Sequence, residues 1–374
     1  MIALDGKTGK MLWHVSAIDQ VFGSPAFMDI NGDHVADIFI PGRSTELFAI
    51  DGSTGEVIWK FNKKGAGKER WYNFYQPQFI HDQDNDGLRD ILISNGGNVM
   101  AEPYEEKKRY PGYLAVLSSR SGTILAKASM PDKKETYMSV AAPPLDSGGD
   151  YQVIFGTGGE TVGGNLFVTT LSAILKGDLS GAKLLDSSPD KGYIGPAAWV
   201  DITGDSFPDI VANAVEGKLV AFNGKTHEKI WSVKVPNSEA YSSIAPGYFT
   251  SDKTPDFFVS YAIGQWPNLE WSKQVMVDGA SGRVAYVDSL GFYQTSTPVV
   301  IDLDGNGTDE ALLSVNIHIY VEHNKRELYN MVVSLDFNRG EVNQLTTPLK
   351  GTNISSTPWI GDMDHDNFLD IVYC

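Results

Sequence analysis

The chain has 374 residues and a formal net charge of −17 at pH 7. This acidic balance argues against nucleic acid and anionic membrane surfaces as partners, because both require a basic surface. Cys374 is the single cysteine, so no internal disulfide can form. No apolar run reaches the roughly 18 residues that a membrane-spanning helix needs.

A hairpin pattern opens the chain and recurs along it. An apolar strand, an Asx-Gly turn and a second strand ending in tryptophan occupy residues 3–13, 49–59 and 221–231. Patterns of this kind are typical of β-hairpins. Because helical periodicity is sustained nowhere, we expect an all-β protein. The tryptophans Trp13, Trp59 and Trp231 recur at one repeat position, and we expect them to pack between neighbouring repeats.

A proline that opens an apolar strand marks each repeat. The seven markers are Pro25, Pro77, Pro143, Pro196, Pro246, Pro298 and Pro358. Their spacing of roughly 50 to 65 residues is that of a four-stranded propeller blade. We therefore predict one domain over residues 1–374, a seven-bladed β-propeller of four-stranded antiparallel blades. The last repeat stops after two strands, so we expect residues 1–13 to complete the blade formed by about 358–374.

An acidic loop of nine residues follows the first strand in five repeats. In residues 82–90, carboxylates at positions one, three, five and nine alternate with spacers, and a strand begins directly afterwards. Oxygen ligands at such spacing suit Ca²⁺, whereas an EF-hand places its last glutamate at position twelve. We predict several structural calcium ions, up to about five. The predicted ligands, with a main-chain carbonyl at position seven, are Asp29, Asn31, Asp33, Val35 and Asp37; Asp82, Asp84, Asp86, Leu88 and Asp90; Asp201, Thr203, Asp205, Phe207 and Asp209; Asp302, Asp304, Asn306, Thr308 and Glu310; and Asp362, Asp364, Asp366, Phe368 and Asp370.

The acidic loops differ among repeats. Thr203 replaces a carboxylate, so we expect loop 201–209 to bind calcium more weakly. The third repeat has a contracted loop at 143–150 and should hold no ion. The fifth, 248–256, keeps the closing aspartate but loses the first acid. Both are interpreted as decayed copies.

The acidic loops resemble the FG-GAP or VCBS-type calcium repeats of integrin α-subunit propellers and related bacterial proteins. The Asp-Gly-x-Thr-Gly-x-x-x-Trp hairpins resemble the PQQ-like repeats of quinoprotein propellers. Together the two patterns cover essentially the whole chain. The resemblance implies a propeller with calcium in the loops between first and second strands. It implies little about activity, because propellers serve as binding proteins, scaffolds and enzymes.

Long connections fall on the face that we expect opposite the calcium loops. They occupy residues 95–112, 156–165 and 262–273, and the sixth repeat is also extended. Aromatic and arginine side chains on such loops suit a protein or sugar contact. The predicted partner-binding residues are Tyr104, Arg109, Tyr110, Trp266, Trp271, His318 and Tyr320. Loop decoration without a partner is the alternative.

Aromatic residues precede the marker prolines, among them Phe22, Tyr75, Tyr137, Tyr193 and Tyr241, with Tyr293 in the sixth repeat. A ring of tyrosines could stack a sugar or grip a peptide. Equally, it could only plug a central channel.

These patterns favour a non-enzymatic, calcium-stabilised propeller that binds protein partners as a scaffold in a bacterial envelope or secretion assembly. The alternative is a carbohydrate-binding protein or a calcium-dependent polysaccharide lyase, with Lys107, Arg109, His318 and His323 as available groups. A PQQ-dependent dehydrogenase is more remote, since quinoprotein dehydrogenases use a vicinal cysteine pair. We expect an extracellular or envelope location, with a signal or anchor lying outside this chain because it starts in mid-repeat.

Overall fold

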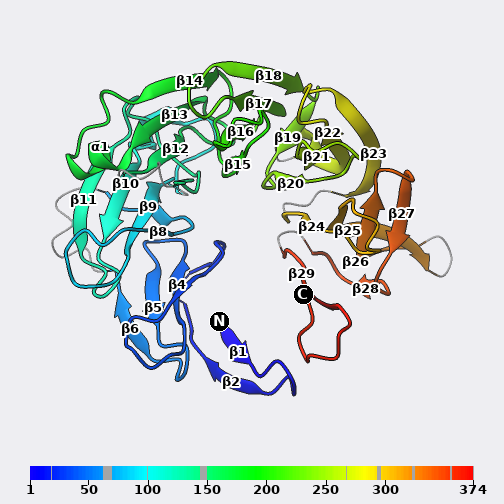
Figure 1. The fold of residues 1–374 in the computed structure, drawn as a ribbon, viewed down its shortest axis with the longest axis horizontal. Helices are drawn as coiled ribbons and strands as arrows, with labels where there is room; N and C mark the ends of the chain where they lie inside the picture. The colour runs from blue at the N-terminus through cyan, green and yellow to red at the C-terminus, as the bar shows by residue number, and fades with distance from the viewer. Residues whose placement is uncertain are drawn as a thin grey trace. The chain divides into compact units, whose positions relative to one another are not determined.

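The computed structural model describes residues 1–17, 19–61, 70–98, 100–143, 150–266, 268–292, 296–321, 325–353 and 356–373. The chain forms two compact units, Met1–Ile194 and Gly195–Cys374. Almost all regular structure is strand, as Figure 1 shows. Among the described residues, the helical elements are α1 (Leu171–Leu175) and the short 3-10 turn η1 (Glu106–Lys108). The all-β prediction is confirmed.

In the part of the chain that the structure describes, the first unit contains four antiparallel sheets. A two-stranded sheet pairs β1 (Ile2–Leu4) with β2 (Met11–His14). A four-stranded sheet follows in chain order: β3 (Ala26–Met28), β4 (Asp37–Pro41), β5 (Leu47–Ile50) and β6 (Val57–Lys60). The next sheet contains β7 (Asn73–Phe74), β8 (Gln78–Ile80), β9 (Asp90–Gly96), β10 (Tyr113–Leu117) and β11 (Ile124–Ser129). The last contains β12 (Gln152–Gly156), β13 (Gly164–Thr170) and β14 (Lys183–Ser188).

Within the described residues, the second unit contains three antiparallel sheets. Its first sheet is β15 (Ala198–Val200), β16 (Asp209–Ala214), β17 (Lys218–Phe222) and β18 (Lys229–Lys234). A ten-stranded sheet follows: β19 (Ser238–Ala240), β20 (Ala245–Gly247), β21 (Asp256–Gln265), β22 (Asn268–Val277), β23 (Val284–Phe292), β24 (Val299–Ile301), β25 (Glu310–Val321), β26 (Lys325–Asp336), β27 (Glu341–Gln344) and β28 (Leu349–Lys350). Two four-stranded sets, β20–β23 and β24–β27, are joined by the pair Phe292 and Asn316, while β19 pairs with β21 and β28 pairs with β26. The unit ends with β29 (Trp359–Gly361) and β30 (Asp370–Val372).

The marker prolines open first strands as predicted in six repeats. Strands β3, β8, β15, β24 and β29 begin one or two residues after their markers, and Pro246 lies within β20. In the third repeat the first strand is reduced to one bridge, Ala141 to Ile154, and residues 144–149 of its contracted loop lie outside the described residues. The strand pairs β1–β2 and β29–β30 belong to different units, so their joining into one blade stays a prediction.

The cores lie between successive sheets. One cluster contains Phe39 and Trp59 of the second sheet together with Ile91 and Ala115 of the third. The middle strands are buried on both faces, and all seven residues of β9 are buried. This is why the second strand of a repeat is an uninterrupted apolar run instead of an alternating one.

Tryptophan side chains connect one sheet to the next. The indole Nε1–H groups of Trp13, Trp59 and Trp231 donate to carbonyls in the following hairpin turn: Gly52 at 3.0 Å, Ser119 at 2.8 Å and Gly279 at 2.8 Å, respectively. In that turn, a glycine with positive φ lies against the indole: Gly55, Gly122 and Gly282. The prediction that these tryptophans pack between repeats is confirmed.

The contact between Trp231 and Gly282 offers a stability test. A Cβ at Gly282 would lie 2.6 Å from the Trp231 ring, and the backbone φ there is +69°. Gly340 occupies the same turn position with φ +66° and has nothing within 4 Å, so it is a matched control. We expect Gly340→Ala to cost about 1 kcal/mol of unfolding free energy, and Gly282→Ala clearly more because the sheets must separate. If urea unfolding showed an equal loss of unfolding free energy in the two variants, the contact between Trp231 and Gly282 would not hold the sheets together.

Candidate functional site

Each acidic loop is wrapped around its first carboxylate. Asp29 accepts backbone N–H groups from Gly32 at 2.7 Å and His34 at 2.9 Å. Asp82 accepts them from Asn85 at 2.7 Å and Gly87 at 2.8 Å. The N–H of Gly32 lowers the pKa of Asp29, and that of Gly87 lowers the pKa of Asp82. The first carboxylate therefore stays ionised and orders the loop.

The ninth residue has a different role in four of the repeats, because Asp37, Asp90, Asp209 and Asp256 are buried and bonded to two loops. Asp209 accepts the N–H groups of Ile202 and Thr203 within its own loop, and that of Gly224 in the next hairpin turn, all at 2.9 Å. Asp256 makes the same two-loop connection through Thr250 and Gly279. Burial raises the pKa of Asp256, as it does that of Asp90 and Glu310. The fifth repeat thus keeps this carboxylate after losing the first acid.

Three of the five predicted loops bring three carboxylates together. In each group the potential ligand atoms lie within 4.8 Å of one another: Asp82, Asp84 and Asp86; Asp302, Asp304 and Glu310; and Asp362, Asp364 and Asp370. Glu310 is 4% exposed, and its Oε1 is buried without a hydrogen-bond partner. An unpartnered buried carboxylate oxygen beside two further carboxylates fits a hard cation such as Ca²⁺.

The other two predicted loops are arranged differently. In loop 29–37 the position-three residue is Asn31, whose amide donates to Asp37 at 3.4 Å and Asp51 at 3.1 Å. In loop 201–209 Thr203 occupies position three. In all five loops the position-seven N–H donates to the position-five side chain, as from Val35, Leu88, Phe207, Thr308 and Phe368. This bond orients the position-five side chain.

Basic side chains from hairpin turns reach three of the loops, which the sequence interpretation missed. Arg120 contacts Asp86 at 2.7 Å, Lys225 contacts Asp205 at 3.3 Å, and Arg339 contacts Asp304 at 2.7 Å. Each comes from the hairpin turn between the last two strands of the same repeat, so its place in that turn was the available signal. These cations are about half exposed, so each pair contributes little stability. They offset part of the loop charge and compete with a metal ion.

In the first unit, two of the predicted insertions meet. The Tyr104 N–H donates to Thr161 Oγ1 at 3.2 Å, and Arg109 Nη2 donates to the same oxygen at 3.4 Å. Arg109 Nη1 pairs with Glu135 Oε1 at 2.6 Å, with side-chain exposures of 9% and 1%. Burial raises the pKa of Glu135. Arg109 is therefore an internal contact and not the exposed residue that we expected.

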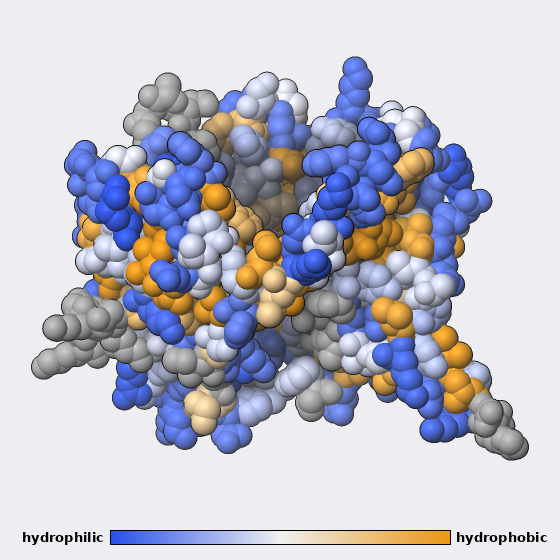
Figure 2. All heavy atoms as spheres, turned by 90° about the horizontal axis from the view of Figure 1, so that it is seen from below, coloured by the Kyte–Doolittle hydropathy of each residue, from blue (hydrophilic) through white to orange (hydrophobic). Residues whose placement is uncertain are grey.

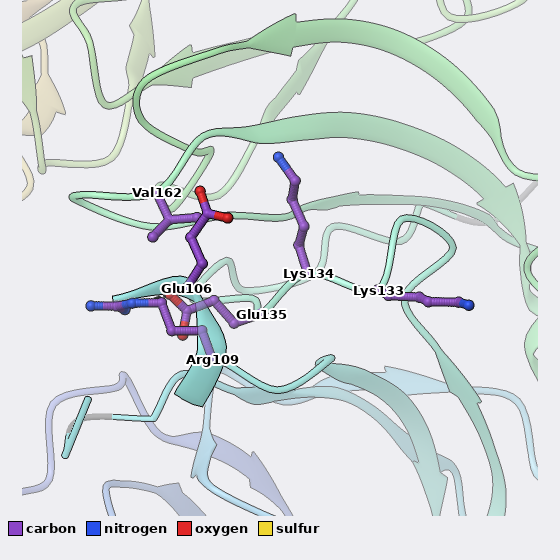
Figure 3. A pocket seen from close by; sticks show the side chains of 6 residues that line it. All are labelled: Glu106, Arg109, Lys133, Lys134, Glu135 and Val162. Atoms are coloured by element: carbon purple, nitrogen blue, oxygen red, sulfur yellow. Dashed lines mark hydrogen bonds and ion pairs between the residues drawn. The ribbon is translucent and has the colours of Figure 1, made fainter. Parts of the chain in front are cut away.

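A pocket of about 210 Å³ lies over this ion pair. Glu106, Arg109, Lys133, Lys134, Glu135 and Val162 line it. Figure 3 shows Glu106 and Lys134 extending to the same side of the Arg109–Glu135 pair, with Val162 beside Glu106. The pocket combines residues from three segments that sequence patterns could not place together.

The predicted aromatic surface residues divide into exposed and packed ones. Tyr104 is 64% exposed. Tyr110 is half-buried, stacks on Tyr72 with ring centroids 6.3 Å apart, and has the Arg70 guanidinium 3.9 Å from its ring centroid. Of the tyrosines before the marker prolines, Tyr75 and Tyr193 are buried. Tyr137, Tyr193 and Tyr241 hydrogen-bond to Glu135, Asp186 and Glu239, respectively, while Tyr293 lies outside the described residues. For Tyr75 and Tyr193 this arrangement favours packing over ligand stacking.

In the second unit, long hairpins present an aromatic sheet surface. Cross-strand pairing puts Trp271 opposite Phe292 and His318 opposite Leu328, and the Phe292 and His318 rings lie 4.1 Å apart. Tyr320 lies two residues beyond His318, so it points to the same side of the sheet. We call Trp271, Phe292, His318, Tyr320 and Leu328 the aromatic sheet surface. Trp271 is 51% and Tyr320 68% exposed, whereas Trp266 is 39% exposed and donates its backbone N–H to Glu239.

The antiparallel sheets identify the class of fold as a β-propeller, and similarity to solved structures agrees. A europium-containing methanol dehydrogenase aligns with 99% of this chain and 78% of its own at a TM-score of 0.61 and 13% identity. BamB from Moraxella catarrhalis aligns with 96% and 87% at a TM-score of 0.51 and 15% identity. At such identities the similarity shows the fold alone. The count of seven blades stays a prediction.

Two sequence comparisons add more specific similarities. Residues 1–166 match the model of a repeat family described as outer membrane protein assembly factor BamB. Protein FAM234B of the mouse, Mus musculus, is 22% identical over 329 residues, which are 80% of this chain and 47% of the relative. The chain thus spans about half the length of the curated relative that it matches.

The roles of the first and ninth carboxylates can be separated by mutation. We expect Asp209→Ala to leave three backbone N–H groups without their acceptor and to cost roughly 3–5 kcal/mol, with or without a chelator. Asp201→Asn keeps an acceptor oxygen in an exposed loop and should change stability much less in chelator. Urea unfolding in EDTA compares the two variants. If Asp209→Ala lowered the free energy of unfolding only in the presence of calcium, this result would contradict a metal-independent role of the Asp209 carboxylate.

Proposed function

We propose that this chain is a non-enzymatic, calcium-stabilised β-propeller that binds a protein partner as a scaffold in an envelope or secretion assembly. The match of residues 1–166 to an outer membrane assembly factor model supports this class of function. Its location would be extracellular or in the cell envelope. Within the described residues, the structure contains no helix with the length and apolarity needed to cross a membrane.

The aromatic sheet surface is the observation that carries the proposal. Figure 2 shows hydrophobic side chains in patches among hydrophilic ones on the molecular face that it displays. Trp271 and Tyr320 project from regular strands, and a residue on a paired strand loses little backbone entropy when it is buried. Tryptophan and tyrosine also dominate binding energy in protein interfaces. Their exposure on a rigid sheet therefore suits a protein contact.

The alternative functions have weaker support. A lyase needs free acid–base and cationic groups, but Arg109 is committed to Glu135 and the His318 ring packs on Phe292. His323, another candidate, lies outside the described residues, as does Cys374. The similarity to methanol dehydrogenase is one of fold, so it supplies no argument for quinone chemistry. Glycan binding remains the second proposal because tryptophan and tyrosine faces also stack on sugars.

Calcium is the proposed cofactor. In the sixth repeat, Asp302, Asp304 and Glu310 would hold one ion, with Glu310 supplying its unpartnered oxygen. The ion would neutralise carboxylates that otherwise repel one another and would tie the loop to β25. The main-chain carbonyls of position seven remain proposed ligands.

Calcium removal should lower stability. An ion that binds only the folded state stabilises it by about 4 kcal/mol per site at a thousandfold excess over Kd. We expect Tm to fall in EDTA and to recover in millimolar CaCl2. Asp302→Asn should reduce this difference, while Asp252→Asn, in a loop that lacks the first acid, should not. An unchanged Tm in EDTA would show that the loops do not use calcium.

The aromatic sheet surface can be tested by site-specific photocrosslinking in the native cells. A crosslinker at Tyr320 should capture one defined protein, and Trp271→Ala should abolish that product. Tyr248 is a matched control, because it is a 49% exposed tyrosine of the same unit in a loop between first and second strands. Equal capture from Tyr248, or no product at Tyr320, would count against this surface as the interface.

A further inference from the structure

The pocket over the Arg109–Glu135 pair has a chemistry that points to a specific kind of ligand. We propose that it binds a carboxylate group of a partner polypeptide, an inference that rests on the proposed protein-binding function and names part of the partner's chemistry. The residues that carry it are Lys134, Glu106 and Val162, above a buried ion pair.

Size limits what the pocket can accept. Its volume of about 210 Å³ is below the roughly 300–1,000 Å³ of pockets for cofactors and drug-sized ligands. An oligosaccharide or a quinone therefore does not fit inside it. A single amino-acid side chain or a chain terminus does, and pockets that receive one residue are common anchor points of protein interfaces.

Hydrogen-bond donors at the pocket favour an anion. Arg109 and Glu135 neutralise each other at 2.6 Å, yet Arg109 Nε is buried without a hydrogen-bond partner. Figure 3 shows the Lys133 side chain extending away from Lys134 and Glu106, so the ammonium group beside Glu106 is that of Lys134. Within the described parts of the chain, no carboxylate forms an ion pair with Lys133 or Lys134. The Lys134 ammonium donates to the Gly163 carbonyl at 2.6 Å and has two further N–H donors.

Glu106 favours a singly charged anion over a doubly charged one as the ligand of the pocket. It is exposed, and it extends to the same side of the ion pair as Lys134 (Figure 3). A phosphate would place a second negative charge near this carboxylate, which costs binding energy. A peptide carboxylate brings one charge together with amide N–H groups that Glu106 can accept. Val162 supplies an apolar wall for methylene groups.

The pocket is built to keep its shape. A Cβ at Gly163 would lie 1.9 Å from the Pro189 carbonyl oxygen, and one at Gly164 would lie 1.7 Å from that of Thr157. The loop that carries Val162 therefore packs closely against neighbouring backbone, with no room for a side chain at either glycine. The Lys133 backbone is in a left-handed conformation with φ +60°, and its N–H donates to the Met130 carbonyl at 3.1 Å. A preformed site loses less entropy on binding.

The inference can be tested with the intact chain and small probes, by following the Val162 methyl resonances in a methyl-labelled sample. N-acetyl-glutamate N-methylamide presents a side-chain carboxylate, and N-acetyl-alanine presents a terminal one. We expect at least one to shift the Val162 signals with Kd on the order of millimolar, and the tighter probe identifies the source of the carboxylate. The neutral glutamine analogue and inorganic phosphate should cause no saturable shift.

Lysine variants complete the test. We expect Lys134→Gln to weaken probe binding about tenfold or more and Lys10→Gln, at an exposed lysine of the same unit, to leave it unchanged. No saturable shift, an equal affinity in Lys134→Gln, or tighter binding of galacturonate than of either peptide probe would overturn the inference. Crosslinking at Tyr320 reports on a different unit, so the proposed function can stand if the pocket binds nothing, and it can fail while the pocket still binds its probes.

Discussion

A buried carboxylate at the end of the loop between first and second strands is the interaction on which four of the repeats depend. Asp37, Asp90, Asp209 and Asp256 are fully buried, and each bonds N–H groups of its own loop and of the adjacent hairpin turn. A buried carboxylate is costly unless it is fully hydrogen-bonded. The two turns must therefore stay together for the second strand to remain in the core.

This constraint explains why repeats can lose metal ligands without losing their shape. The fifth repeat lacks the first acid, yet Asp256 still joins its loop to the turn at Gly279. The exposed acids can then vary, and basic side chains such as Arg339 can approach them. Strand pairing and loop connection belong to the fold, while metal binding is an added property of particular loops.

The opposite ends of the strands are free of this constraint, and there the repeats diverge. Two insertions of the first unit fold onto each other around Arg109 and Glu135, whereas β25 and β26 of the second unit extend into a long hairpin. Burying an ion pair as tightly as Arg109–Glu135 adds little net stability and more often fixes a conformation. We interpret both regions as surfaces shaped for binding. The sheets that carry them are stabilised at the other strand ends, by the buried carboxylates.

The sequence by itself determined the strand pattern, the repeat length, the hairpin turns and the nine-residue loops. All of these depend on residues close together in the chain, such as Asp209 and the N–H of Ile202, so local spacing is sufficient. It also indicated that Trp13, Trp59 and Trp231 pack between repeats, because one residue recurring at one position implies one environment. Only the tertiary structure decided that Arg109 is buried, that Arg120 and Arg339 reach acidic loops, and that Lys134 and Val162 share a pocket. These contacts join residues from separate turns and connections, and no local pattern specifies which side chains long-range folding brings within reach.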